Sequence, residues 1–153
     1  MKRISHIGSL LKRIYRLYSG ELLILLQDKG FTDLRPSFLE VLLAICEKDG
    51  PSIKEIGFAC GLKKQTMTSH LNELEKRGYI TRATNVYDKR EQNIFLTEFG
   101  QRFKFALNES ISELEKSYTM ILGDVELDRF EHLLSGVHTK IMASLKNELP
   151  LEH

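Results

Sequence analysis

The most constraining feature of this chain is the order of three patterns in its middle third. Residues 63–77 place apolar side chains at helical spacing behind a polar face, and Gly78 ends that helix. Residues 79–84 and 91–97 then alternate apolar with polar side chains, as strands do, around a polar loop. A polar-faced helix followed by a two-stranded ribbon is the order of a winged helix-turn-helix, so we expect a mainly α fold with a small β-wing.

The segment before this helix predicts three further helices. Apolar residues recur at helical spacing over residues 5–28 and predict a first helix that Gly30 closes. Pro36 suits the first turn of a second helix, which we expect to end near Gly50 and which is apolar nearly all round. Such a helix belongs at the centre of a domain.

Ser52 and Glu55 have the spacing of a capping box, in which each side chain satisfies a backbone donor of the other residue. This pattern predicts the start of a short third helix over residues 53–60. Gly61 then permits the sharp turn into the helix over residues 63–77.

From residue 98 the helical period returns and continues beyond Gly123 to the end of the chain. The helices at the two ends have more apolar face than a small central module can cover, although each face could also pack on its own domain. We therefore expect residues 1–30 and 105–150 to form a helical dimerisation lobe, with residues 32–100 as the winged helix-turn-helix lobe.

The length of 153 residues fits a single domain over residues 1–150. Residues 151–153 read Leu-Glu-His and are interpreted as the remnant of an expression tag. The longest apolar run, over residues 22–26, is too short for a membrane helix, so we expect no membrane association and a cytoplasmic location. Two cysteines fit free thiols.

The formal net charge of +1 is unevenly distributed. Lys and Arg outnumber Asp and Glu by four over residues 52–104, whereas Asp and Glu outnumber them by five over residues 105–153. The middle of the chain is therefore where a phosphate backbone is expected to bind.

The helix over residues 63–77 has the two faces that a groove-binding helix needs. Met67, Leu71 and Leu74 supply an apolar inner face, and polar side chains surround them. Lys63 and Lys64 stand at the helix start, where cations oppose the macrodipole by a few tenths of a kcal/mol each. Phosphate contacts would offset this cost; the alternative is a pair of solvated side chains.

The loop of the ribbon carries the triplet Asp88-Lys89-Arg90. An arginine at such a tip can enter the minor groove, and a neighbouring carboxylate can orient its guanidinium. The triplet alone is a weak signal, but it stands just before an alternating strand and 21 residues after Met67.

Over residues 32–100 the chain resembles the MarR family of bacterial winged-helix repressors. The matching elements are LEKRGYI at residues 74–80, the pair Thr81-Arg82, the run Tyr87-Asp88-Lys89-Arg90, the run Phe95-Leu96-Thr97, and Gly100. The flanking helices also have the family's layout, so the resemblance extends over nearly the whole chain.

The resemblance implies a homodimer that reads a pseudo-palindromic site on double-stranded DNA. It implies that Arg90 is the wing arginine, with Asp88 as its partner. Departures from the family pattern are Lys63, where a capping Asp, Ser or Thr is frequent, Gln65, where Ser is common, and Ser69, which replaces a frequent Arg. With the charged side chains, the expected DNA-binding residues are Lys63, Lys64, Gln65, Thr66, Thr68, Ser69, Asp88, Lys89 and Arg90.

Many members of the family bind small aromatic effectors between the DNA-binding lobe and the dimer lobe. The residues of this chain that could line such a cleft are Tyr15, Tyr18, Phe38, Leu42 and Phe103. Aromatic residues at helical spacing are also what an ordinary core contains, so both interpretations stay open.

The sequence therefore favours a transcriptional regulator, most simply a repressor released by a ligand. The alternative is a winged-helix protein-interaction module or antirepressor partner without specific DNA binding. No nucleophile, phosphate-loop or metal-ligand motif is present, so we expect no catalysis, no cofactor and no metal site. The scattered histidines support this, apart from His132 beside Glu131, and Cys46 suits an apolar helix face better than a sensor site.

Overall fold

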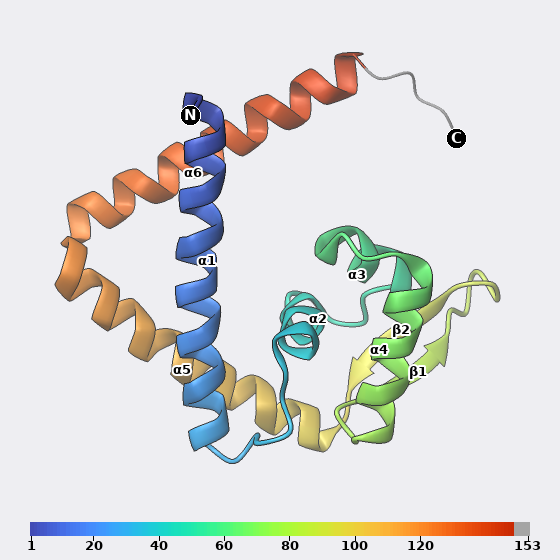
Figure 1. Cartoon of the computed structure of the whole chain (residues 1–153). Helices are drawn as coiled ribbons and strands as arrows, with labels where there is room; N and C mark the ends of the chain where they lie inside the picture. Colours follow the sequence, from blue (N-terminus) through green and yellow to red (C-terminus); the bar gives the residue numbers. More distant parts are fainter. Residues whose placement is uncertain (149–153) are drawn as a thin grey trace. The chain divides into compact units, whose positions relative to one another are not determined.

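The computed structural model describes residues 1–148 and contains six helices and one two-stranded sheet in that range (Figure 1). The interpretation of residues 151–153 as a tag remnant lies outside the described residues. The elements are α1 (Arg3–Asp28), α2 (Pro36–Cys46), α3 (Ile53–Cys60), α4 (Lys64–Lys76), β1 (Ile80–Thr84), β2 (Gln92–Leu96), α5 (Glu98–Leu122) and α6 (Asp124–Glu148).

This order confirms the mainly α fold with a β-wing that the sequence predicts. Contacts divide the chain into two units, Met1–Ile111 and the segment from Ser112 onwards. The first unit contains the helix-turn-helix and the wing. None of the helices within residues 1–148 combines the length and the apolar character that crossing a membrane requires.

Helix α2 lies at the centre of the first unit and contacts α1, α3, α4 and β2. Six of its eleven residues are buried, namely Phe38, Leu39, Val41, Leu42, Ala44 and Ile45. The predicted end near Gly50 was wrong, because α2 ends at Cys46. Pro51 disfavours helical geometry at the residue before it, and Gly50 turns into the left-handed region with a φ of 61°.

The helix-turn-helix consists of α3 and α4. The Ser52 hydroxyl accepts a hydrogen bond from the Glu55 backbone N–H at 3.1 Å, and the Glu55 carboxylate accepts one from the Ser52 N–H at 3.1 Å. This confirms the predicted capping box. Gly61 ends α3 with a φ of 64°, and α4 then buries Met67, Leu71 and Leu74 as its inner face.

The wing is an antiparallel pair in which Ile80 lies opposite Leu96 and Thr84 opposite Gln92. The loop before α3 adds to this sheet, since the Ile94 N–H donates to the Pro51 carbonyl at 2.9 Å. Each strand is slightly shorter than predicted.

The base of the wing abuts the start of α5 at Gly100. A Cβ at this position would overlap the Tyr79 carbonyl oxygen and crowd the Leu96 side chain. Only glycine fits this close approach, which explains why the residue stands just after β2.

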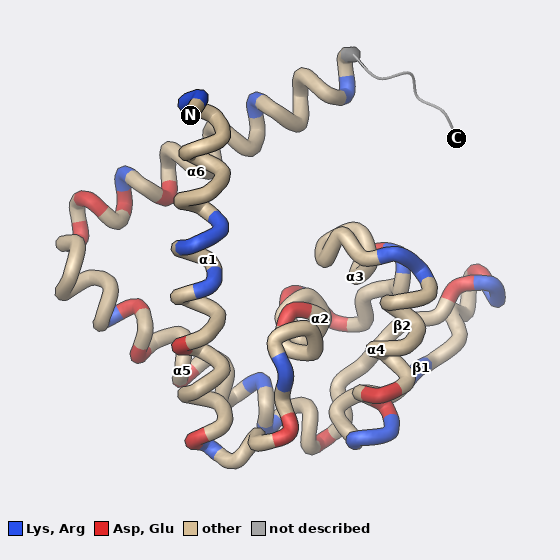
Figure 2. The backbone as a smooth tube through the Cα atoms, viewed as in Figure 1, with Lys and Arg blue, Asp and Glu red and all other residues tan. Residues whose placement is uncertain are grey.

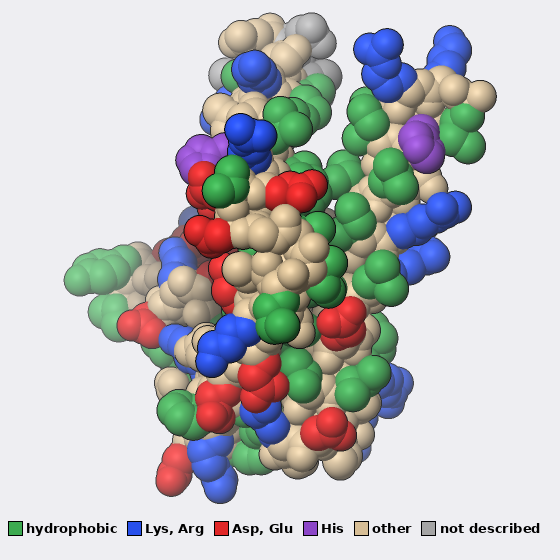
Figure 3. Space-filling view, turned by 90° about the vertical axis from the view of Figure 1, so that its left-hand side faces the viewer, with side chains coloured by type: hydrophobic (Ala, Val, Ile, Leu, Met, Phe, Trp, Pro, Cys, Tyr) green, Lys and Arg blue, Asp and Glu red, His purple; other side chains and the backbone are tan. Residues whose placement is uncertain are grey.

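The long helices leave apolar side chains exposed. On α1 these are Ile4, Ile7, Leu10, Leu11, Ile14 and Leu17, and Figure 3 shows hydrophobic side chains at the surface among the cationic ones along this helix. In the second unit, α6 begins after Gly123, as expected, and exposes Val125, Leu133, Leu134, Val137, Ile141 and Leu145. All of these side chains are at least partly exposed in the described part of a single chain.

Replacing the capping serine tests how α3 is held. Ser52→Ala removes the acceptor for the Glu55 N–H, so we expect the free energy of unfolding to fall by about 1 kcal/mol. Denaturant titration measures the change. Ser37→Ala is the matched control, because Ser37 is exposed and caps no helix; equal losses in the two variants would contradict the role of the cap.

Candidate nucleic-acid interface

The outer face of α4 carries the polar residues that the sequence predicts for groove contacts. Burial of Met67, Leu71 and Leu74 against the core turns the opposite side of the helix to solvent. The exposed residues on or next to this face are Lys63, Lys64, Gln65, Thr66, Thr68 and Ser69. The Thr68 hydroxyl donates to the Lys64 carbonyl at 2.9 Å. Its one proton is therefore used, and it can only accept a hydrogen bond from a group outside the helix.

The start of α4 concentrates positive charge. Lys63 is the N-cap residue and provides no side-chain cap, and α4 has no acidic residue in its first turn. Among residues 1–148, neither Lys63 nor Lys64 forms an ion pair with a carboxylate. Figure 2 shows the cationic segment at this end of α4. Unpaired cations next to free backbone N–H groups form a surface suited to an anion.

The wing tip holds the second group of predicted contacts. Asp88 Oδ1 accepts from the Arg90 backbone N–H at 3.0 Å and lies 3.4 Å from Arg90 Nε. The Arg90 side chain is 93% exposed, so its terminal nitrogens extend into solvent. The expected pairing of Asp88 with Arg90 is therefore present, and Lys89 is exposed beside it.

A groove of about 1060 Å³ separates the start of α4 from the wing tip. It brings together Lys64, Asp88, Lys89 and Arg90 from the predicted set. Its wall also includes residues that sequence reasoning missed on α3, Lys54 and the exposed Phe58. In the sequence, only their position on the first helix of the helix-turn-helix could have indicated that they lie beside the wing.

The far end of α4 is fixed by a clamp that the sequence did not predict. Asp33, in the loop before α2, accepts from the Tyr79 hydroxyl at 2.9 Å. Its backbone carbonyl accepts from Arg77 Nη1 at 2.6 Å, and its carboxylate lies 3.4 Å from the same nitrogen. Burial, and then the hydrogen bond to Asp33, raises the pKa of Tyr79. The Arg77 guanidinium also lies 4.9 Å from the centre of the Phe38 ring.

Arg82 ties β1 to α4. Its guanidinium donates to the Asn72 side chain and lies 3.4 Å from a Glu75 carboxylate oxygen. Asn72, which is exposed and polar, is thereby engaged within the protein. The orientation of the wing relative to α4 follows from these contacts.

The five residues proposed for an effector cleft fall into different surroundings. Tyr15 and Tyr18 lie together on α1, with ring centres 6.3 Å apart, and burial is the largest cause that raises the pKa of each phenol. Phe38 packs edge-on against His70, and Phe103 packs edge-on against Phe31 and Tyr79. Phe38, Leu42 and Phe103 are buried core residues.

The two thiols and the acidic helix face offer little chemistry. Burial raises the pKa of Cys46 and of Cys60 to about 11, which leaves both thiols protonated near neutral pH. Asp128, Glu131 and His132 lie within one turn of α6 and have side-chain ligand atoms within 4.8 Å of one another, but all three are exposed. His132 Nδ1 already contacts the Asp128 carbonyl oxygen at 2.9 Å.

Residues 32–91, which hold α2, the helix-turn-helix, β1 and the wing loop, match the family model described as the MarR family. Over these residues the chain is similar to the MarR family. The HTH-type transcriptional regulator SarZ of Staphylococcus saprophyticus is 35% identical over 98 residues, which cover 64% of this chain and 66% of SarZ. A second curated regulator matches over 35% of its own length. The chain thus spans less than two thirds of these relatives.

Solved structures of two transcriptional regulators share the fold. The transcriptional repressor CouR, bound to a 23-mer DNA duplex, is 24% identical with a TM-score of 0.73 and covers 90% of this chain and 96% of its own. The PcaV transcriptional regulator of Streptomyces coelicolor, in complex with its natural ligand, is 21% identical with a TM-score of 0.68 and covers 91% and 96%. At these identities the similarity establishes the fold alone.

Proposed function

We propose that this chain is a sequence-specific DNA-binding transcriptional regulator of the MarR family, and that it acts in the cytoplasm as a homodimeric repressor without catalytic activity. The observation that carries the proposal is the groove that Lys64, at the start of α4, lines together with the exposed Arg90 of the wing tip; Lys63 precedes Lys64 as the exposed N-cap residue of the helix. CouR, a repressor of the same fold, is bound to a DNA duplex.

The geometry assigns a different task to each group of side chains. A helix in the major groove places Gln65, Thr66 and Ser69 next to base edges, where amide and hydroxyl groups read sequence. Lys63 and Lys64 then meet the phosphates that flank the groove. The exposed guanidinium of Arg90 suits the narrow, electronegative minor groove of an A·T-rich flank. The sugar-phosphate backbone that separates the major from the minor groove of the DNA would pass over the protein groove between α4 and the wing.

If the chain were instead a protein-interaction module, the surface that faces a DNA groove in a DNA-binding protein would be expected to lack net positive charge. The four cationic side chains expected to contact DNA are instead all exposed; they are Lys63, Lys64, Lys89 and Arg90. An enzyme would need a nucleophile with its base, and the two thiols have a pKa of about 11. Both alternatives are therefore weaker than the DNA-binding regulator.

A homodimer would cover the exposed apolar faces of α1 and α6. Single exposed apolar residues are ordinary, but rows of them at helical spacing along two helices mark an interaction surface. A two-fold dimer also presents two copies of α4, which matches a pseudo-palindromic site.

The proposal includes a small aromatic effector that binds next to Tyr15 and Tyr18. A phenol is already protonated at physiological pH and burial raises the pKa of both further, so each can donate a hydrogen bond to a ligand. PcaV, which shares the fold, has a structure with its natural ligand. Because Phe38, Leu42 and Phe103 are buried, a ligand would reach them only after side chains move.

Selection from a random duplex library tests the proposed function. Purified protein is expected to enrich an inverted repeat, and its affinity for the selected duplex should fall steeply with salt because phosphate contacts release counterions. A scrambled duplex is the control. Equal affinity for the selected and scrambled duplexes would contradict sequence-specific binding.

Arg90→Ala is expected to weaken binding to the selected duplex by about 1 to 3 kcal/mol, with the loss concentrated where the flanks are rich in A·T pairs. Titration against duplexes with A·T and G·C flanks measures this difference. Arg90→Lys keeps the charge but loses the planar guanidinium and should also lose the flank preference. Full binding by Arg90→Lys would instead make Arg90 a simple phosphate contact.

Lys64→Ala is expected to lower affinity nearly equally for all duplexes. Because one phosphate contact is lost, the slope of log K against log salt should decrease by about one unit. Lys140→Ala on α6 makes the same change of charge at an exposed site in the second unit and should leave the slope unchanged. A slope that does not respond to Lys64→Ala would remove the phosphate contact from the mechanism.

Sedimentation equilibrium tests the dimer. The protein is expected to sediment as a dimer at micromolar concentration, and Ile141→Glu, which places a charge in the exposed apolar face of α6, should shift it towards monomer. Lys140→Glu alters the charge at the next residue and serves as the control. A wild-type monomer at micromolar concentration would contradict the dimer.

A further inference from the structure

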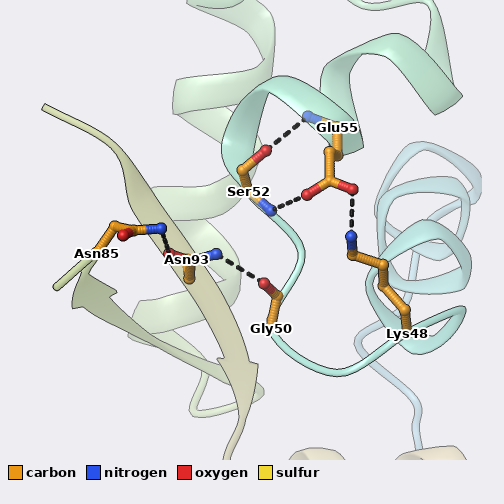
Figure 4. A network of polar contacts seen from close by, with 6 residues as sticks. All are labelled: Lys48, Gly50, Ser52, Glu55, Asn85 and Asn93. Carbon is orange, nitrogen blue, oxygen red and sulfur yellow. Dashed lines mark hydrogen bonds and ion pairs between the residues drawn. The ribbon is translucent and has the colours of Figure 1, made fainter. Parts of the chain in front are cut away.

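Two asparagines connect the wing to the helix-turn-helix through their side chains. Asn93, on β2, donates from Nδ2 to the Gly50 carbonyl at 2.8 Å. Asn85, in the loop after β1, donates from Nδ2 to Asn93 Oδ1 at 3.1 Å. Figure 4 shows this series of contacts. Because Gly50 belongs to the loop between α2 and α3, the two amides link the wing loop to the body of the domain.

The series continues from Asn85 to the wing tip. Asn85 Oδ1 accepts from the backbone N–H of Tyr87 at 2.8 Å and of Asp88 at 3.2 Å, which is the pattern of an Asx turn. Asp88 Oδ1 in turn accepts from the backbone N–H of Arg90 and lies 3.4 Å from its Nε. An unbroken set of hydrogen bonds therefore runs from Gly50 to the guanidinium of Arg90.

The other end of this series is firmly anchored. The Glu55 carboxylate accepts from the Ser52 N–H and pairs with the Lys48 ammonium (Figure 4). The hydrogen bond from Lys48 is the largest cause that lowers the pKa of Glu55. Together with the hydrogen bond from Ile94 to Pro51, these contacts fix the loop that holds Gly50.

Arg90 itself has no comparable support, because its side chain is 93% exposed and Asp88 is its partner in the described structure. We propose that Asn85 and Asn93 are positioning residues that hold the wing tip in the conformation from which Arg90 enters the minor groove. The inference rests on the proposed function. The two amides act by ordering the tip before binding, so that less conformational entropy is lost when DNA binds.

The first test uses the free protein. In ¹⁵N relaxation measurements we expect the backbone order parameters of Tyr87, Asp88 and Arg90 to be close to those of a rigid backbone, about 0.85, and to fall below about 0.6 in Asn93→Ala. Asn147→Ala, at an exposed position on α6, is the matched control. Unchanged order at the tip of Asn93→Ala would overturn the proposal.

The second test is a double-mutant cycle on the duplex selected from the random library. In the wild-type background Asn93→Ala should weaken binding about 3- to 10-fold. In the Arg90→Ala background the same substitution should weaken binding less than about 2-fold, because its effect passes through Arg90. Equal losses in the two backgrounds would overturn the positioning role.

Asn85→Ala breaks the same series from the side of the tip and replaces Asn93→Ala if thermal unfolding shows that the latter does not fold. A wild-type protein that binds no duplex would overturn the proposed function and this inference together. The inference alone would be overturned by a different result. In that case the wild-type protein binds the selected duplex and its salt slope responds to Lys64→Ala, but the effects of Asn93→Ala and Arg90→Ala on binding are additive.

Discussion

Burial of α2 is the interaction on which the rest of the structure depends. Because α2 contacts α1, α3, α4 and β2, each of these elements turns its apolar side towards the same helix. The polar side of α4 is therefore exposed as a consequence of packing. Fully burying a leucine or phenylalanine contributes about 1.5 to 3 kcal/mol, which is far more than the few tenths of a kcal/mol lost by lysines at a helix start. The core can thus tolerate a surface that is locally unfavourable.

The two cationic groups differ in how they are held. Lys63 and Lys64 are placed by the backbone of α4, whose two ends are set by the turn at Gly61 and by the clamp on Asp33. Arg90 is placed by a loop whose conformation depends on side-chain amides. A rigid helix suits contacts that read bases in register, whereas a tethered loop can follow differences in minor-groove width.

Periodicity and turn chemistry made most of the fold predictable from the sequence. The capping box at Ser52, the stop at Gly78 and the inner face of α4 each depend on residues within a few positions of one another. The end of α2 was misplaced because Gly50 is the next stop signal in the sequence, whereas the helix ends four residues earlier, at Cys46. The clamp on Asp33 and the link between Asn85 and Asn93 join residues that share no pattern, so no local rule could have indicated them. The five aromatic and aliphatic residues of the expected cleft were grouped by type, which does not distinguish core positions from a binding site.

The clamp at Asp33 has a mechanical consequence. One carboxylate contacts both Arg77, at the end of α4, and Tyr79, just before β1, and it lies in the short connection that leaves α1. The contact that fixes the end of α4 therefore lies in the connection that follows α1. A small rotation of that connection would tilt α4 and the wing together, so in the proposed dimer the spacing of the two copies of α4 along a duplex would respond to a change that touches no surface facing the bases.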